Sequence, residues 1–326
     1  MFTTSYDDPV TLLPTPDLLR SRLAEPGLHR ALDYFAVQAP DRADFTAAVR
    51  QIRTSADALG RVAEVVAQLR AGMGRMLTVQ EAFLPAAFDP QDPAEPVAAR
   101  FFYPVAFAAT LSDTLAFHRS RAVPDTASRA ILADLGRHLR VFERTFGHTG
   151  LHEQNWLTLH LRGMIYDFGR LQADLERLDF SAAQVRAARV PVVRGSTVAG
   201  VHIPDSGPLA SSEVDASLRR IRPFFERHFP DLSPVTTAVC RSWLLDDQLL
   251  QLAPGTNIAR FCQRWAPIGE PADGDESVRT FVFRRPYADP AELTAHTRLE
   301  RALLAHWAAG GHMQQRSGWL KLPALH

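Results

Sequence analysis

The sequence predicts an α+β protein, with an all-α N-terminal domain over residues 1–185 and a mixed α/β domain over residues 186–326. Up to about residue 178, apolar residues recur at helical spacings in segments rich in Ala, Leu and Arg. After about residue 189, β-branched runs alternate with fewer helix patterns. The length of 326 residues also favours two domains, because it is about twice the usual domain size.

The N-terminal domain is expected to be a succession of helices. Apolar residues at helical spacings predict them over residues 18–35, 44–76, 101–118, 125–146 and 156–178. Residues 85–96, PAAFDPQDPAEP, are rich in proline and are therefore expected to form a loop.

The last of these predicted helices, which begins WLTLHLRGMIYDFGRLQ, carries candidate site residues. Its apolar residues form one stripe, and Trp156, His160, Gly163 and Asp167 follow the edge of that stripe. We expect Trp156 and Asp167 to line a substrate pocket and His160 to be a second candidate for proton transfer. The alternative is that Trp156 and His160 are ordinary core residues.

The C-terminal domain is expected to contain a largely antiparallel sheet with two helices. Residues 190–203 predict a hairpin or two short strands. The other predicted strands cover residues 235–245, 257–265, 278–284 and 319–322. Helix starts are predicted at Ser211 and at Thr297, where Thr297 and Glu300 have the spacing of a capping box.

Composition excludes several classes of protein. With 36 basic and 36 acidic residues the net charge is zero, which argues against broad electrostatic binding to nucleic acid or to acidic membranes. The N-terminus does not resemble a signal peptide, and no apolar run reaches the roughly 18 residues of a membrane span, so a cytoplasmic protein is expected. Cys240 and Cys262 are too few for a disulfide scaffold and are expected to be buried, inert thiols.

The common catalytic and nucleotide-binding motifs are absent, and no histidine pair has metal-ligand spacing, so no metal is expected. His202 is the best candidate for proton transfer, because it ends a predicted strand in GVHIPDSGPL and histidine titrates near neutral pH. The alternative is that His202 only hydrogen-bonds the turn at Pro204.

Arg284 and Arg285 follow a predicted strand and precede the helix that starts at Thr297. Free backbone N–H groups and the helix dipole make such a helix start favourable for a pyrophosphate. Glu300 nearby weakens this interpretation, and the alternative is a pair of surface arginines.

Five ordered blocks carry a family resemblance: WLTLHLRGMIYDFGRLQ, GVHIPDSGPL, CRSWLLDDQL, NIARF and LERALLAHWAAGGHMQQRSGWL. Over residues 20–322 the chain resembles actinobacterial acyltransferases with an α-helical N-terminal domain and a GNAT-like C-terminal domain. Within this group it is most similar to the N-acyltransferases of teicoplanin-type lipoglycopeptide assembly.

The resemblance implies an enzyme that moves a long aliphatic acyl chain from acyl-CoA to the amine of a glucosamine on a glycopeptide core. It implies direct transfer, with His202 as general base and with the thioester between the two domains. Trp243 in CRSWLLDDQL is expected to contact the coenzyme, together with Arg284, Arg285 and Thr297. The expected partners are small molecules only.

One departure concerns the loop that holds the coenzyme. GNAT enzymes carry a Q/R-x-x-G-x-G/A loop, and its expected place here, residues 289–297 (DPAELTAHT), contains no glycine. Two alternatives remain open: an acyl-CoA-dependent acyltransferase that uses another small amine, or a non-catalytic acyl-CoA-binding protein.

Overall fold

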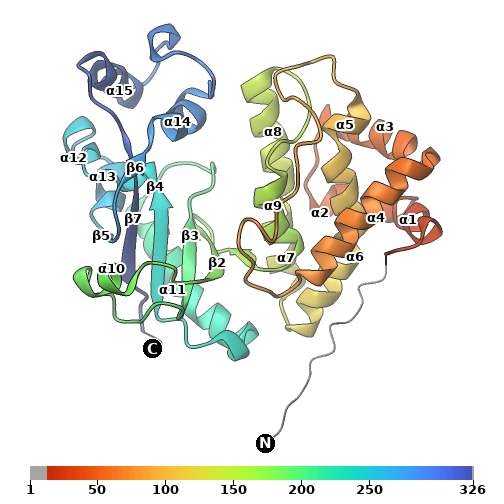
Figure 1. The fold of residues 1–326 in the computed structure, drawn as a ribbon, viewed down its shortest axis with the longest axis horizontal. Coiled ribbons are helices and arrows are strands. Elements are labelled where there is room, and N and C mark those ends of the chain that lie inside the picture. Colours follow the sequence, from red (N-terminus) through yellow and green to blue (C-terminus); the bar gives the residue numbers. More distant parts are fainter. Residues whose placement is uncertain (1–12, 325–326) are drawn as a thin grey trace, which may run out of the picture. The chain divides into compact units, whose positions relative to one another are not determined.

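The computed structural model describes residues 13–324 and divides the chain into two compact units, Met1–Met164 and Ile165–His326 (Figure 1). The sequence prediction put this boundary at residue 185, about 20 residues later. The difference arises because residues 165–177 form the first two strands of the C-terminal sheet and so belong to that unit.

The described part of the N-terminal unit is helical, as predicted. Its helices are α1 (Pro16–Arg22), α2 (Gly27–Tyr34), α3 (Asp41–Thr54), α4 (Ala56–Ala71), α5 (Val97–Arg100), α6 (Phe102–Ser120), α7 (Asp125–Leu132), α8 (Asp134–Phe146) and α9 (Gln154–Leu161). Helix α6 is buried on nearly every side over its first half, because it is apolar all round and forms the centre of the unit. The proline-rich segment 85–96 has no helix or strand, which confirms the predicted loop.

The single helix predicted over residues 156–178 is wrong. Helix α9 ends at Leu161, and Gly163 then adopts a φ of +67°. A Cβ at this position would lie 2.5 Å from a ring carbon of Phe117, so only glycine fits. The remaining residues form β1 (Ile165–Asp167) and β2 (Gln172–Arg177), joined by a turn at Gly169.

The C-terminal unit is built on one mixed sheet with the strand order β1-β2-β3-β4-β7-β5, and β6 also pairs with β7. The further strands are β3 (Thr197–His202), β4 (Thr237–Ser242), β5 (Ala266–Pro267), β6 (Ala272–Asp273) and β7 (Gln314–Lys321). All neighbouring strands are antiparallel except β3 and β4, which run parallel and are connected through α11 (Ser211–His228). The prediction of a largely antiparallel sheet is therefore confirmed.

Smaller elements complete this unit. They are α10 (Ala182–Ala187), η1 (Pro230–Leu232), η2 (Trp243–Leu245), α12 (Leu249–Leu252), α13 (Asn257–Cys262), α14 (Asp275–Val278), the π-helical turn η3 (Arg279–Phe283), η4 (Pro290–Glu292) and α15 (Arg298–Ala308). The helices predicted from Ser211 and from Thr297 are confirmed, as are strands within residues 235–245 and at the C-terminal end. Thr297 and Glu300 form the predicted capping box.

Two predicted strands are helical instead. Residues 257–265 contain α13, which begins where the Thr256 hydroxyl accepts a hydrogen bond from the N–H of Ala259. Residues 278–284 continue α14 as a π-helical turn. In both segments the run of apolar residues is too short for its periodicity to distinguish a strand from a helix. Residues 190–203 contain a single strand, β3 (Thr197–His202), rather than the predicted hairpin or two short strands.

The two faces of the sheet differ. On the face of Tyr166, helix α11 packs through aromatic rings, and the ring centroid of Phe224 lies 4.6 Å from that of Tyr166. The other face carries an apolar cluster at one end, where Val185 of α10 packs against Val198 and Val239. Successive side chains of a strand point to opposite faces, so Asp174 and Glu176 of β2 lie on this second face, the face of Val198. Helix α10 packs on the apolar end of this face, and the polar residues lie on the part that α10 does not cover.

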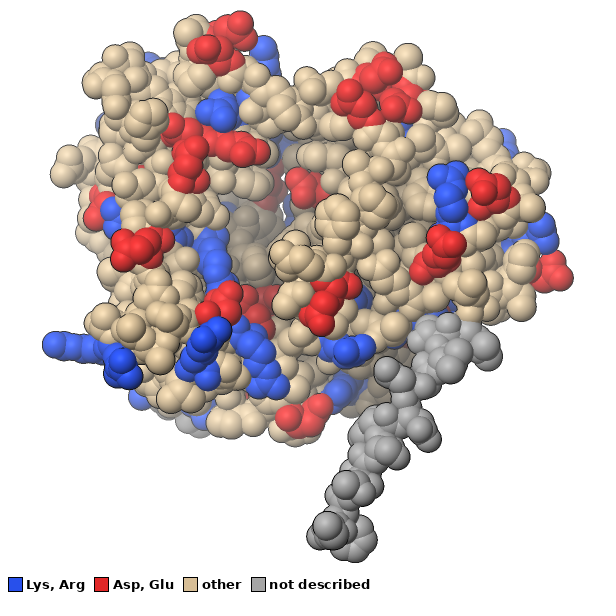
Figure 2. Space-filling model, in the orientation of Figure 1, with Lys and Arg blue, Asp and Glu red and all other residues tan. Residues whose placement is uncertain are grey.

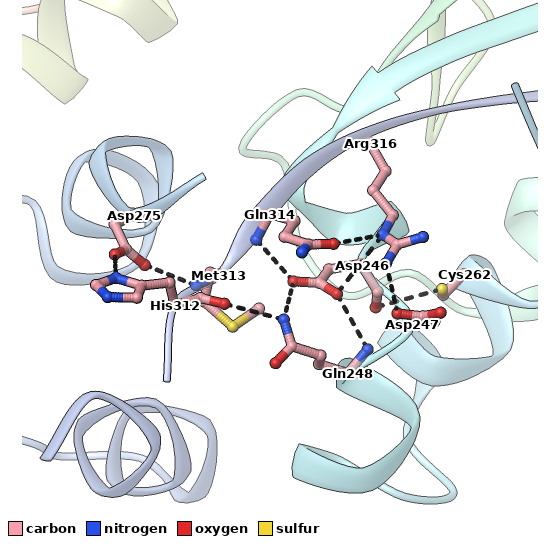
Figure 3. A network of polar contacts seen from close by, with 9 residues as sticks. All are labelled: Asp246, Asp247, Gln248, Cys262, Asp275, His312, Met313, Gln314 and Arg316. Atoms are coloured by element: carbon pink, nitrogen blue, oxygen red, sulfur yellow. Dashed lines mark hydrogen bonds and ion pairs between the residues drawn. The ribbon is translucent and has the colours of Figure 1, made fainter. Parts of the chain in front are cut away.

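A buried polar network joins the segment after β4 to the start of β7 (Figure 3). The Asp246 carboxylate has no exposed surface and accepts hydrogen bonds from the Gln248 N–H at 3.1 Å, the Gln248 side-chain amide at 2.9 Å and the Gln314 N–H at 2.7 Å. Nearby, the Asp275 carboxylate accepts from the Met313 N–H at 2.7 Å and is bonded to His312. These two carboxylates fix the path of the chain into β7.

Basic and acidic side chains are interspersed on the face drawn in Figure 2, as expected for a balanced composition. Over residues 13–324, none of the helices is both long and apolar enough to cross a membrane.

Candidate active site

His202 stands at the end of β3 and is paired with a carboxylate of β2. Its Nε2 lies 3.1 Å from Oδ1 of Asp174, which is brought to it by the antiparallel register that sets Asp174 opposite Gly200. The His202 side chain is 31% exposed and that of Asp174 is 9% exposed. The imidazole is therefore accessible, whereas the carboxylate that orients it is not. A buried carboxylate in this position fixes the ring and stabilises the imidazolium that forms when the ring takes a proton.

A second ion pair continues the polar row on this face. Arg241 of β4 donates to both carboxylate oxygens of Glu176, at 2.7 and 3.0 Å, and to Asp179 at 2.8 Å. Burial raises the pKa of Glu176, the charge of Asp174 raises it further, and Arg241 opposes both. We call the four side chains His202, Asp174, Glu176 and Arg241 the polar row.

The parallel ladder beside His202 ends early. In the described chain, the ladder between β3 and β4 consists of two residue pairs, Ala199 with Ala238 and Gly200 with Val239. Both strands continue further, since β2 still pairs with His202 and β7 still pairs with Ser242. The facing edges of β3 and β4 thus separate next to the histidine.

The loop from β3 to α11 is held in one shape by arginines. Arg170 donates to the carbonyl oxygens of Pro204 at 3.1 Å, Gly207 at 2.8 Å and Pro208 at 2.9 Å. These carbonyls therefore point toward Arg170. Arg284 donates to the Asp205 carboxylate at 2.5 Å.

The N-terminus of α15 is already occupied by a carboxylate. Glu300 accepts from the N–H groups of His296 at 2.5 Å and Thr297 at 2.7 Å. Partial burial raises the pKa of Glu300, but the hydrogen bonds from the two backbone N–H groups outweigh it, so the pKa is lowered. Because the Glu300 carboxylate already lies at this helix start, a pyrophosphate there would meet a like charge, and the site is a poor one for it.

Arg284 and Arg285 thus have different surroundings. Arg284 adopts a left-handed φ of +58° at the end of η3 and faces the loop after His202 through Asp205. Arg285 lines a surface pocket of about 260 Å³ beside α15. The other residues that line this pocket are Val282, Phe283, Glu292, Leu293, Thr294, His296 and Glu300.

His160 lies in the core of the N-terminal unit. Its Nε2 is 2.9 Å from Oδ2 of Asp134, both side chains are 1% exposed, and Asp134 also pairs with Arg137. Burial lowers the pKa of His160, which the neighbouring Asp134 opposes. The Trp156 ring packs against His160 with centroids 5.6 Å apart. This geometry favours the structural alternative for both residues.

Two further sequence candidates, Asp167 and Trp243, lie in separate turns of the C-terminal unit. Asp167 accepts a hydrogen bond from the Gly169 N–H at 2.7 Å in the turn between β1 and β2. It therefore shares no helix with Trp156 or His160. Trp243 is 7% exposed in η2, the turn that follows β4.

Sequence reasoning identified His202 but missed Asp174. The available signal was the period-2 alternation of Gln172, Asp174 and Glu176 with apolar residues, which is typical of a strand with one polar face. That signal was obscured by the helical periodicity of the leucines around it.

The cysteines are poor nucleophiles. Burial raises the pKa of Cys240 to about 12 and that of Cys262 to about 11, so neither is a thiolate at neutral pH. Among residues 13–324, no three His, Cys, Asp or Glu side chains gather as metal ligands.

Comparison with known proteins agrees with this architecture. Residues 26–163 match the family model of the N-acyltransferase N-terminal domain, and residues 165–320 match that of the GNAT-like C-terminal domain. An acyltransferase solved in complex with decanoyl-CoA is 34% identical, covering 96% of this chain and 90% of its own, with a TM-score of 0.76. The chain belongs to this family of two-domain N-acyltransferases.

A second solved acyltransferase, in complex with decanoyl-CoA and teicoplanin, is 30% identical, covering 95% of this chain and 100% of its own, with a TM-score of 0.78. A sequence search of curated proteins gives no match. The family predicted from the five sequence blocks is confirmed, and so is the prediction of an enzyme. The two family models meet at residues 163 and 165, where the structure also divides the chain.

Proposed function

We propose that this N-acyltransferase moves a long aliphatic acyl group from acyl-CoA to the amine of a glucosamine on a glycopeptide antibiotic core. The observation that carries the proposal is the likeness, at 30% identity over 95% of the chain, to an acyltransferase that binds decanoyl-CoA and teicoplanin. The paired and accessible His202 supports it, because amine acylation needs a proton acceptor. Since acyl-CoA is a cytoplasmic metabolite, we expect the reaction to take place there.

The chemistry is a direct transfer. The amine nitrogen attacks the thioester carbon, a C–N bond forms and the C–S bond breaks. His202 takes the proton that the amine loses and returns it to the departing coenzyme A thiolate, while Asp174 stabilises the imidazolium. A thioester is already activated toward amines, so an acyl-enzyme is not needed. The high pKa of both cysteine thiols agrees with this.

The separation of β3 and β4 supports a place for the thioester. Strand edges that no longer pair with each other offer backbone N–H groups to a chain lying between them, and one such group can stabilise the tetrahedral oxyanion. A thioester between β3 and β4 also favours a different location for the coenzyme pyrophosphate. We place it at the N-terminus of the 18-residue helix α11, which is the next helix after β3, rather than in residues 289–297.

In this arrangement Arg284 acts on the coenzyme site indirectly, through Asp205 of the loop that leads into α11. We propose no direct contact with the pyrophosphate for the other three candidates, Arg285, Thr297 and Trp243.

The test is a transfer assay with decanoyl-CoA and a deacylated teicoplanin core, with product masses and released thiol as readouts. The proposal expects one decanoyl group on the glucosamine amine and one coenzyme A released. His202→Ala should lower kcat by about 10²–10³ and leave the acyl-CoA Kd within about twofold. His312→Ala is the matched control, because its ring is 78% exposed and belongs to the network around Asp275.

Acylation of simple amines but not of the glycopeptide would contradict the acceptor and favour a transferase of another amine. Binding of decanoyl-CoA without consumption would leave only a binding protein.

A further inference from the structure

We infer that Gly200 is a positioning residue of the active site, whose missing side chain makes room for the Asp174 carboxylate to lie across β3 and hold His202. This rests on the proposed role of His202 as general base. Gly200 lies in the middle of β3, two residues before His202 and directly opposite Asp174.

The space above Gly200 is filled by carboxylate oxygens. A Cβ built at residue 200 would lie 2.2 Å from Oδ1 of Asp174 and 3.3 Å from its Cγ. The same Cβ would lie 3.2 Å from Oε2 of Glu176. The first distance is far inside a van der Waals contact, and the atom concerned, Oδ1, is the one that contacts His202 Nε2. A methyl group at residue 200 therefore cannot coexist with the observed contact between Asp174 and His202.

Backbone conformation does not explain this glycine. Gly200 is not among the residues with positive φ, in contrast to the turn glycines Gly163 and Gly169. Glycine within a strand weakens the strand and often marks a close approach of another group. The close approach here is that of the carboxylate, so the requirement is one of space alone.

The carboxylate has few other positions to take. On the side away from His202, Glu176 occupies the same face, and its oxygens are held at 2.7 and 3.0 Å by Arg241. Two carboxylates repel each other, so Asp174 is better placed toward the histidine than toward Glu176. The polar row thus directs Asp174 to His202, and Gly200 provides the surface on which it lies.

A double-mutant cycle with Asp174 tests this inference. Gly200→Ala should lower kcat by about 10–10² and leave KM for acyl-CoA within about twofold, because the base loses its orienting partner while the coenzyme contacts remain. Asp174→Ala removes the atom that the new methyl group would meet. Adding Gly200→Ala to Asp174→Ala should therefore leave kcat unchanged and lower Tm only slightly, because the 3.2 Å approach to Glu176 Oε2 remains. Gly60→Ala is the control, since a Cβ there meets nothing within 4 Å.

The cycle remains informative if Gly200→Ala alone folds poorly. In that case the double variant should come close to the Tm of Asp174→Ala, because the clash with Asp174 has been removed. Additive losses of kcat in the double variant would overturn the inference, and so would full activity of Gly200→Ala. These outcomes differ from failure of the proposed function, in which the unmodified enzyme does not acylate the glycopeptide or His202→Ala retains its turnover.

Discussion

Replacing Asp246 by asparagine should destabilise the chain far more than the same replacement at the next residue, Asp247. Both carboxylates face Arg316, with Asp246 Oδ1 at 3.9 Å from Nε and Asp247 Oδ1 at 3.1 Å from Nη2. They differ in burial, because the Asp246 side chain is 0% exposed and that of Asp247 is 62% exposed. The pair therefore separates the effect of a buried acceptor from that of a surface ion pair.

The magnitude follows from the hydrogen bonds that asparagine cannot keep. The two oxygens of Asp246 accept from the N–H and side-chain amide of Gln248 and from the N–H of Gln314. Asparagine has one acceptor oxygen, so at least one partly buried donor faces its NH₂ group instead. An unsatisfied buried donor costs about 1–3 kcal/mol, and loss of the charge weakens the remaining bonds. Together we expect the free energy of unfolding to fall by about 2–4 kcal/mol.

Exposed ion pairs contribute little, so Asp247→Asn should lower the free energy of unfolding by less than about 1 kcal/mol. The measurement is urea unfolding of the full chain, followed by circular dichroism and by tryptophan fluorescence. If the two variants lose equal stability, or if Asp247→Asn loses more, then the network in Figure 3 does not stabilise the start of β7 as argued.

Three further predictions concern other residues. Thr297→Ala removes the cap of α15 and should lower the free energy of unfolding by about 0.5–2 kcal/mol without weakening acyl-CoA binding; lost affinity in calorimetric titration with an unchanged Tm would return the pyrophosphate to that helix. Burial raises the pKa of Asp41 in α3 to about 6, helped by neighbouring carboxylates, so its protonation stabilises the folded state below about pH 4 and this stability is lost as the pH rises through 6. Asp41→Asn should therefore be more stable than the unmodified protein by about 1–3 kcal/mol at pH 8 and similar to it at pH 4, which urea titrations at the two pH values would measure. Cys240→Ala and Cys262→Ala should each keep turnover, whereas a loss of about 10² or more in kcat would require an acyl-enzyme.

The sequence was sufficient for most helices of the N-terminal unit, for α11 and α15, and for the two-part architecture, because those depend on local periodicity and caps. The Thr297 and Glu300 capping box is an example: it is contained in four consecutive residues and appears in the structure as predicted. The segment 156–178 shows where periodicity fails. Leu171 and Leu175 are four residues apart, which suits one face of a helix and also the same face of a strand. The conformation of Gly163 decides between them.

Half of the candidate site could be found in this way. His202 was identified because it ends a strand pattern, which is a local property. Asp174 lies 28 residues earlier, and its contact with His202 depends on the register of β2 against β3. Register is set by packing of whole strands, so no pattern around either residue alone reports it. The same holds for Gly200, because the need for a glycine there comes from the Asp174 carboxylate of another strand and not from its own backbone conformation.

The early end of the β3–β4 ladder has a consequence for how such an enzyme can diversify. The rims of that opening are peptide groups, and every amino-acid sequence that preserves the fold presents the same peptide groups. In the proposed arrangement, recognition of the part common to all acyl-CoA donors therefore does not depend on the choice of side chains. Substitutions elsewhere can then change the acyl chain or the amine that is accepted without altering the contacts with coenzyme A.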